Sequence, residues 1–325
     1  MTIIRRRFLQ LASAAAALPA VSRLAHAETY PARPVHIVVP VPPGGALDIT
    51  ARLIGNWLSQ HMGQSFIVDN RPGGGTNIGV EVVAHANADG YTLLLMPQSV
   101  TINPGLYKSL PFNFIRDVIP ISMIVQFPLV MEVSTAVPAK TVPEFIAYAK
   151  ANPGKVNMAS GGVGSPSHVV GELFQQTTGI KMEHVPYHGG APALAAMMAN
   201  QVQVMFSPLP ESIASIKAGK VRALAVTSLR RVAELPDTPA VAETVPGFEA
   251  VSWNGIGAPK KTPADIVAKL NKEINTALAD PAIKTRLTQL GGTPSPLSTP
   301  AFEQFIVSET KKWGDVVHKA GITVQ

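Results

Sequence analysis

Short apolar, β-branched runs alternate with helical patterns along this chain, and this alternation constrains its fold more than any other feature. Residues 35–41, 66–68 and 92–96 are expected to be strands, and helical spacing of apolar residues separates them. Strands that alternate with helices predict an α/β architecture with largely parallel sheets. A length of 325 residues exceeds one ordinary domain and fits two lobes.

A long apolar run at residues 119–133 predicts a strand that crosses into a second lobe, and residues 250–258 predict a return strand. We therefore expect lobe I to comprise residues 28–127 and 255–325, and lobe II to comprise residues 128–254. Two connections between lobes would form a hinge, with a ligand in the cleft at the C-terminal ends of the strands. Within lobe II, strands are expected near residues 156–159, 183–186, 202–206 and 222–227.

Capping residues predict where several helices begin. Asp48 is expected to be the N-cap of a helix. The apolar face of that helix is expected to consist of Ile49, Leu53 and Trp57, with Ile54 and Leu58 at its edge. Residues 141–144 (Thr-Val-Pro-Glu) have the pattern of a capping box. Prolines at positions 263, 281 and 300 each predict the first turn of a C-terminal helix.

Residues 1–27 have the pattern of an export signal. Three arginines at positions 5–7 precede an alanine-rich stretch of about a dozen residues, too short to span a bilayer, which takes about 20. Residues 25–27 (Ala-His-Ala) form a cleavage site, so we expect twin-arginine export, cleavage after Ala27 and a soluble periplasmic protein. An uncleaved N-terminal anchor is the alternative.

The charge and cysteine content exclude several classes of function. The formal charge of +6 belongs largely to the leader, and the remaining 23 basic and 21 acidic residues leave +2. No later stretch combines a basic run with aromatic residues, so nucleic acid is not an expected partner. The absence of cysteine excludes disulfides, a lipid-anchored cysteine, thiolate catalysis and cysteine metal sites.

Two glycine-rich loops, one in each expected lobe, lie between a strand and a helix. They are residues 42–48 (Pro-Pro-Gly-Gly-Ala-Leu-Asp) and residues 160–168 (Ser-Gly-Gly-Val-Gly-Ser-Pro-Ser-His). Glycine allows close backbone approach, and N–H groups at a helix N-terminus favour an anion. Neither loop contains lysine or arginine, so an anion there would rely largely on N–H and hydroxyl donors. Glycine content alone leaves a simple tight turn as the alternative.

Asp48 would repel an anion bound at the first loop. Helix capping is therefore its expected role, and binding the ammonium group of an amino-acid ligand is the alternative.

Signatures of catalysis are missing from the sequence. It contains no G-x-S-x-G or H-E-x-x-H motif and no phosphate-binding loop. Pro186 prevents His184 and His188 from sharing a helical face, so polar roles in a pocket or loop are expected for the histidines rather than metal binding with His168.

The order of motifs along nearly the whole chain resembles the Bug-type receptors, the periplasmic solute-binding components of tripartite tricarboxylate transporters. The matching stretches are residues 30–34 (Tyr-Pro-Ala-Arg-Pro), 39–40 with 43–48 (Val-Pro; Pro-Gly-Gly-Ala-Leu-Asp), 68–73 (Val-Asp-Asn-Arg-Pro-Gly), 88–93 (Ala-Asp-Gly-Tyr-Thr-Leu), 184–187 (His-Val-Pro-Tyr), 222–228 (Arg-Ala-Leu-Ala-Val-Thr-Ser), 235–239 (Leu-Pro-Asp-Thr-Pro) and 253–255 (Trp-Asn-Gly). The set in this order is highly specific. Two departures affect ligand preference: His188 stands where the family often has lysine, and Val41 where it often has an aromatic residue.

The resemblance implies a type II periplasmic-binding fold, no catalysis, no cofactor, and ligand carboxylates held by the two loops partly through ordered water. The implied partners are a small organic carboxylate and the membrane subunits of a tripartite transporter, and a monomer is expected. The candidate ligand-binding residues are Pro43, Gly44, Gly45, Ala46, Leu47, Asp48, Gln98, Ser99, Ser160, Gly161, Gly162, Gly164, Ser165, His168, Tyr187, His188 and Ser207.

The ligand is expected to be an anion bound mainly by backbone donors. The N–H groups of Gly44, Gly45, Gly161, Gly162 and Gly164 are expected to be accessible, with hydroxyls of Ser160 and Ser165 and apolar walls of Ala46, Leu47 and Val163 around them. These few donors favour an aliphatic dicarboxylate or an aromatic acid over citrate. Arg71 and His188 are candidates for holding a second charge. A periplasmic enzyme such as a hydrolase, or an extracytoplasmic sensor subunit, remains the alternative function.

Overall fold

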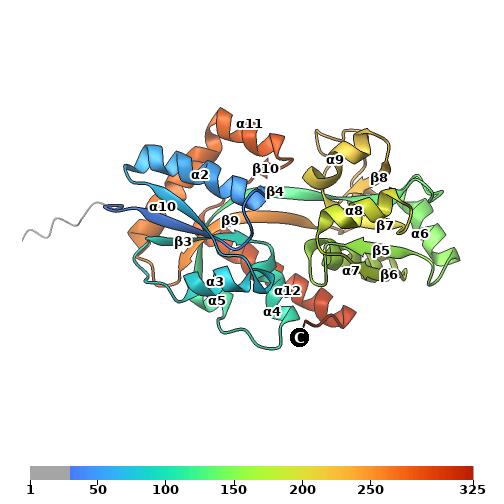
Figure 1. The fold of residues 1–325 in the computed structure, drawn as a ribbon, viewed down its shortest axis with the longest axis horizontal. Coiled ribbons are helices and arrows are strands. Elements are labelled where there is room, and N and C mark those ends of the chain that lie inside the picture. Colours follow the sequence, from blue (N-terminus) through green and yellow to red (C-terminus); the bar gives the residue numbers. More distant parts are fainter. Residues whose placement is uncertain (1–29, 325) are drawn as a thin grey trace, which may run out of the picture.

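Residues 30–324 are described by a computed structural model, and they form two lobes joined by two long strands (Figure 1). The expected export signal and cleavage point at residues 1–27 lie outside the described residues and stay predictions. Within residues 30–324, no helix is both long enough and apolar enough to cross a membrane.

The first lobe is built on three parallel strands at the positions where the sequence predicts them. β1 (Val35–Val39) lies between β2 (Phe66–Asn70) and β3 (Thr92–Pro97) and pairs with both. α2 (Ala46–Met62) connects β1 to β2, and α3 (Asn77–Ala84) lies between β2 and β3. Parallel pairing puts the C-terminal ends of all three strands at one edge of the sheet, where ligands bind in folds of this kind.

The second lobe repeats this plan. β5 (Asn157–Ser160) lies between β6 (Glu183–Pro186) and β7 (Val204–Pro208) and pairs with both in parallel. β8 (Val221–Val226) follows them in the chain. The helices of this lobe are α6 (Val142–Ala151), α7 (Pro166–Thr178), α8 (Gly190–Met198) and α9 (Leu209–Lys217).

β4 (Val118–Ser134) and β9 (Val251–Pro259) pass between the lobes. β4 pairs with β9 up to Pro128 and with β7 from Leu129 onward, so it exchanges partners between these two residues. The sequence predicts largely parallel sheets, but β4 and β9 pair antiparallel with each other and with their neighbours β3, β7 and β8. The reason is that one strand leaves the first lobe while the other returns to it.

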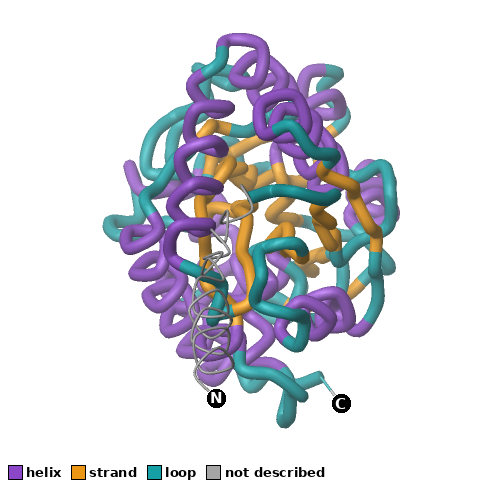
Figure 2. The backbone as a smooth tube through the Cα atoms, turned by 90° about the vertical axis from the view of Figure 1, so that its left-hand side faces the viewer, coloured by secondary structure: helices purple, strands orange, loops and turns teal. Residues whose placement is uncertain are grey.

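The remaining elements complete the surface of the molecule, and Figure 2 shows helices on both sides of the strands. They are η1 (Gly74–Thr76), α4 (Ser99–Leu106), α5 (Phe114–Asp117), η2 (Val241–Glu243), α10 (Ala264–Ala279), α11 (Pro281–Gln289), β10 (Thr293–Pro294) and α12 (Thr299–Ala320).

α2 buries a different face from the one the sequence predicts. Ala51, Ile54 and Leu58 are fully buried, whereas Leu53 and Trp57 are only partly buried. Gly55 lies on the buried face, where a Cβ would come within 3.3 Å of the Phe66 carbonyl oxygen. The absence of a side chain at Gly55 therefore lets the helix lie close to the sheet on this face.

The last helix joins the lobes a third time, a contact that the sequence does not predict. Trp313, Val316 and Val317 of α12 belong to the same buried core as Phe174 of α7. Gln176 of α7 donates from Nε2 to the Val316 carbonyl at 3.0 Å. The C-terminal half of α12 therefore packs on the second lobe.

Candidate functional site

The first loop leads from β1 into the N-terminus of α2 and presents open backbone. Gly45 is the N-cap of α2, with an extended φ of −82° and ψ of 171°. Gly44 has a left-handed φ of 94°, which glycine adopts at little cost. A Cβ at either residue would meet no atom within 4 Å. The N–H groups of the first helical turn have no partner inside the helix, so this helix start offers donors to an anion.

The sequence predicts Asp48 as the N-cap of α2, but the helix already begins at Ala46, and Gly45 is its N-cap. Its buried carboxylate instead accepts hydrogen bonds from the Gly44 N–H at 2.9 Å, from Arg52 Nε at 2.9 Å and from Asn70 Nδ2 at 2.9 Å. Burial would raise the pKa of Asp48, but these hydrogen bonds, led by Arg52, lower it to about 2. Asp48 therefore shapes the loop and occupies the N–H of Gly44, so the expectation that this N–H is accessible is wrong. The charge of Asp48 is already compensated by Arg52.

The second loop leads from β5 into α7, and the N–H groups of its glycines are bonded within the loop. The acceptors are Ser167 Oγ for Gly161 at 3.0 Å, Ser160 Oγ for Gly162 at 3.1 Å, and His168 Nδ1 for Gly164 at 3.0 Å. The expectation that these glycines present accessible N–H groups is wrong, because neighbouring serine and histidine side chains occupy them. Gly162 and Gly164 have φ values of 129° and 76°, so glycine is needed to shape this loop.

Two histidines stack behind the second loop. The rings of His168 and His184 lie 3.6 Å apart at an interplanar angle of 6°, and His184 Nε2 lies 2.6 Å from Ser160 Oγ. Burial, followed by the neighbouring His168, lowers the pKa of His184 to about 4. The His184 ring is therefore neutral at pH 7. The described part of the chain contains no group of three or more potential metal ligands.

A pocket of about 310 Å³ separates the second loop from α4. Among the predicted residues, Ser99, Gly161, Gly162, Gly164 and Ser165 line it. Val163 and Pro166 of the same loop also line it. Its wall further contains residues that no sequence motif indicates, namely Gly75, Thr76, Asn103, Leu106, Tyr107 and Val324. The structure thus brings Ser99 together with the second loop, whereas the first loop does not line this pocket.

Gln98 and Asn254 place two buried amides at the C-terminal edge of the first-lobe sheet. Gln98 follows β3 and is 2% exposed, and Asn254 lies opposite Pro97 on β9 and is 1% exposed. Neither amide has a hydrogen-bond partner among the described residues. An unpaired buried polar group costs about 1–3 kcal/mol, so both amides are suited to ordered water or a bound solute. Gln98 is among the residues predicted from the sequence, whereas Asn254 is not, although the motif at residues 253–255 contains it.

Ser207 donates a hydrogen bond to Glu132 Oε1, and both residues are buried inside the second lobe. Burial raises the pKa of Glu132 to about 8, despite the opposing effect of the Ser207 hydroxyl. Ser207 thus has a partner within the lobe. Tyr187 holds the second loop through its N–H, which donates to the Ser160 carbonyl at 3.0 Å, whereas the side chains of His188 and Arg71 are exposed.

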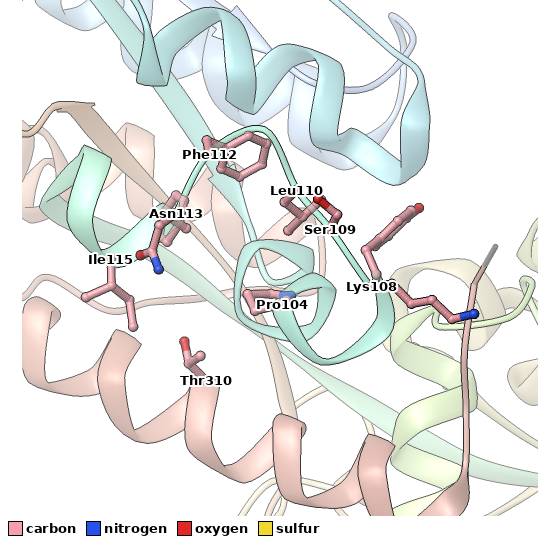
Figure 3. A pocket seen from close by; sticks show the side chains of 10 residues that line it. Pro104, Lys108, Ser109, Leu110, Phe112, Asn113, Ile115 and Thr310 are labelled. Atoms are coloured by element: carbon pink, nitrogen blue, oxygen red, sulfur yellow. The ribbon is translucent and has the colours of Figure 1, made fainter.

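A second pocket, shown in Figure 3, has a volume of about 270 Å³ and lies between residues 104–115 and Thr310 of α12. No residue that the sequence predicts for ligand binding lines it. The candidate site therefore consists of the two loops and the sheet edges that carry them.

Two α/β lobes joined by a pair of strands, with a loop and a helix start at the inner edge of each sheet, define a type II periplasmic-binding-protein fold. The family model for the tripartite tricarboxylate transporter family receptor matches residues 50–322. The protein BugT of Bordetella pertussis is 37% identical over 298 residues, which are 91% of each chain. The chain therefore belongs to the tripartite tricarboxylate transporter receptor family, and the resemblance found in its sequence is confirmed.

Two solved structures extend this comparison. An R. palustris protein with adipate has a TM-score of 0.80 and 34% identity, and the match covers 91% of this chain and 100% of that chain. MatC from Rhodopseudomonas palustris with bound malate has a TM-score of 0.75 and 32% identity, and the match covers 89% of this chain and 100% of that chain.

Proposed function

We propose that the chain is a periplasmic receptor that captures a small organic carboxylate and delivers it to a tripartite tricarboxylate-type membrane transporter. The open N-terminus of α2 carries this proposal, because a Cβ at Gly44 or Gly45 would meet no atom within 4 Å. Helix N-termini with free N–H groups bind anions. Adipate and malate, present in two similar structures, are small carboxylates and support this ligand class.

The two lobes would hold the carboxylate in different ways. The first lobe offers N–H donors of α2, and Asp48 does not oppose the anion because Arg52 compensates its charge. The second loop is already shaped by its own hydrogen bonds, so it would contribute hydroxyl groups and a fixed surface. These few donors favour a dicarboxylate or an aromatic acid over citrate.

Lobe I would comprise residues 28–127 and 255–325, and lobe II residues 128–254. The partner exchange of β4 between Pro128 and Leu129 supports the first boundary. The lobes would rotate about this hinge and close on the ligand. The receptor would act as a monomer and bind without chemical change to the ligand, after export and cleavage behind Ala27.

A thermal-shift screen tests this proposal, because a bound ligand stabilises the folded state by RT ln(1 + [L]/Kd). Adipate, malate, succinate, benzoate and citrate are the anions, and a neutral sugar and a polyamine are the controls. We expect stabilisation by at least one small carboxylate, which is then recovered unchanged. Stabilisation by the sugar or the polyamine alone, or conversion of the carboxylate, would refute the proposal.

A further inference from the structure

Glu211 lies at the inner edge of the second lobe, although no sequence motif singles it out. It belongs to the first turn of α9, which follows β7, and β7 is the parallel neighbour of β5, the strand that precedes the second loop. A Cβ at Gly190, the first residue of α8, would lie 2.0 Å from Glu211 Oε2. The carboxylate of Glu211 therefore rests against the start of α8.

The start of α8 in turn adjoins the second loop. A Cβ at Gly161 would lie 3.4 Å from the backbone nitrogen of Gly190. The second loop, the start of α8 and the Glu211 carboxylate thus follow one another along the same wall. A solute held at Gly161 would lie along the same wall as this carboxylate.

Glu211 differs from the acid of the first loop in having no partner. Asp48 is paired with Arg52, but within residues 30–324 no hydrogen bond or ion pair reaches the Glu211 carboxylate. Surrounding protein atoms raise the pKa of Glu211 by desolvation, although the residue remains exposed. Glu132, the acid buried behind it, has its pKa raised to about 8 and is mostly uncharged at pH 7.

An uncompensated carboxylate beside a binding loop changes which ligands are favoured. A second carboxylate group near Glu211 would be repelled, whereas a protonated amine would gain both a charge partner and a charge-assisted hydrogen bond. Attraction in a cleft between two lobes is also screened less by salt than attraction on an open surface.

We propose that Glu211 is a specificity-determining residue that binds a protonated amine. The ligand would then be a carboxylate bearing an ammonium group, and this inference rests on the proposed function. The ligand carboxylate would lie at the N-terminus of α2 and its ammonium group against Glu211, so each lobe would bind one charge. The other role open to Glu211 is to stabilise the start of α8 through the helix dipole. That role predicts a change in stability with no change in ligand preference.

Calorimetric titration with matched ligands tests this proposal. The pairs are succinate with aspartate, glutarate with glutamate, and adipate with 2-aminoadipate, and the members of each pair differ only by the amino group. We expect at least one amino member to bind the wild type at least about tenfold more tightly than its partner. Glu211→Gln should reduce this ratio to about one by weakening binding of the amino member, while binding of the plain dicarboxylate stays equal or improves.

Glu183→Gln is the matched control. Glu183 is an exposed acid of the same lobe at the opposite end of its strand from the cleft, and its substitution should leave the ratio unchanged. Equal affinities within every pair, or a ratio that survives Glu211→Gln, would overturn the role of Glu211 while leaving the carboxylate receptor intact. If Glu211→Gln lowers the melting temperature but leaves the affinity ratio unchanged, Glu211 stabilises the start of α8 and does not select the ligand. Failure of all six compounds to bind would overturn this inference, and the proposed function would fall with it only if malate, benzoate and citrate also fail to stabilise the protein.

Discussion

Glu132→Gln should remove a loss of stability that we expect for the wild type between pH 6.5 and 8. Glu132 is fully buried on β4, and desolvation raises its pKa from 4.5 to about 8. Between these pH values the folded state keeps a proton that the unfolded state has lost. Stability therefore falls as pH rises, by about 1.4 kcal/mol per pH unit, and levels off above the folded pKa.

His184 has the opposite effect in a lower range. Its pKa falls from 6.5 to about 4 on folding, so the unfolded state binds the extra proton and stability rises with pH between these values. The two effects roughly cancel between pH 4.5 and 6.5. From pH 6.5 to 8 the His184 effect no longer opposes that of Glu132, and Glu132 should cost the wild type about 2 kcal/mol of stability.

Urea unfolding at pH 5.5, 6.5, 7.25, 8 and 9, followed by tryptophan fluorescence, measures this loss. Glutamine keeps the shape of Glu132 and can still accept the hydrogen bond from Ser207. The variant should gain stability up to pH 6.5 and then change little. Glu211 acts in the same direction as Glu132, but the single substitution must remove most of the fall. A flat wild-type profile from pH 6.5 to 8, or an equal fall in Glu132→Gln, would refute the reasoning.

Four further predictions follow from the site and the fold. Gly45→Val should abolish carboxylate binding while costing about 1 kcal/mol or less of stability, because the Gly45 backbone is extended and the space around it is open. Gly314→Val, also in open space, is the control, and calorimetry with thermal melting measures both variants. Asp48→Asn should destabilise the fold by about 1–3 kcal/mol in urea unfolding, because Arg52 loses its charge partner; an unchanged midpoint would contradict this. Small-angle scattering should give a smaller radius of gyration with saturating carboxylate, and an unchanged radius would count against lobe closure. Mass spectrometry of the exported protein should find Glu28 at the N-terminus, and an intact residue 1 would exclude cleavage.

Local sequence patterns predicted much of the fold. The strand from Val35, the crossing strand around Pro128 and the helix opened by Asp280 all form where the sequence predicts them, because β-branched runs and capping residues act on their own neighbours. The predicted N-cap of α2 was wrong by three residues, because Gly45 takes the place expected for Asp48. Gly45 provides no capping side chain, so its role as N-cap leaves little local signal.

The chemistry of the site depended on contacts that sequence spacing does not reveal. The glycine pattern at residues 161–164 marks a loop between strand and helix, but only the fold shows that Ser160, Ser167 and His168 occupy its N–H groups. The position of Glu211 beside Gly190 likewise depends on the order β7, β5, β6 in the sheet. The loop bonds join residues at most six apart, but their pairing depends on the conformation of the loop, whereas the contact of Glu211 with Gly190 joins two separate segments.

The docking of α12 makes the second lobe inseparable from the rest of the chain. Trp313, Val316 and Val317 each remove apolar surface from water in the core that contains Phe174, at roughly 2 kcal/mol per side chain. A fragment cut at residues 128 and 254 would lack all three and expose their binding surface. Loss of several kilocalories from a fold of marginal stability leaves such a fragment largely unfolded. The two lobes should therefore melt in one cooperative transition, and the smallest piece able to fold must include both.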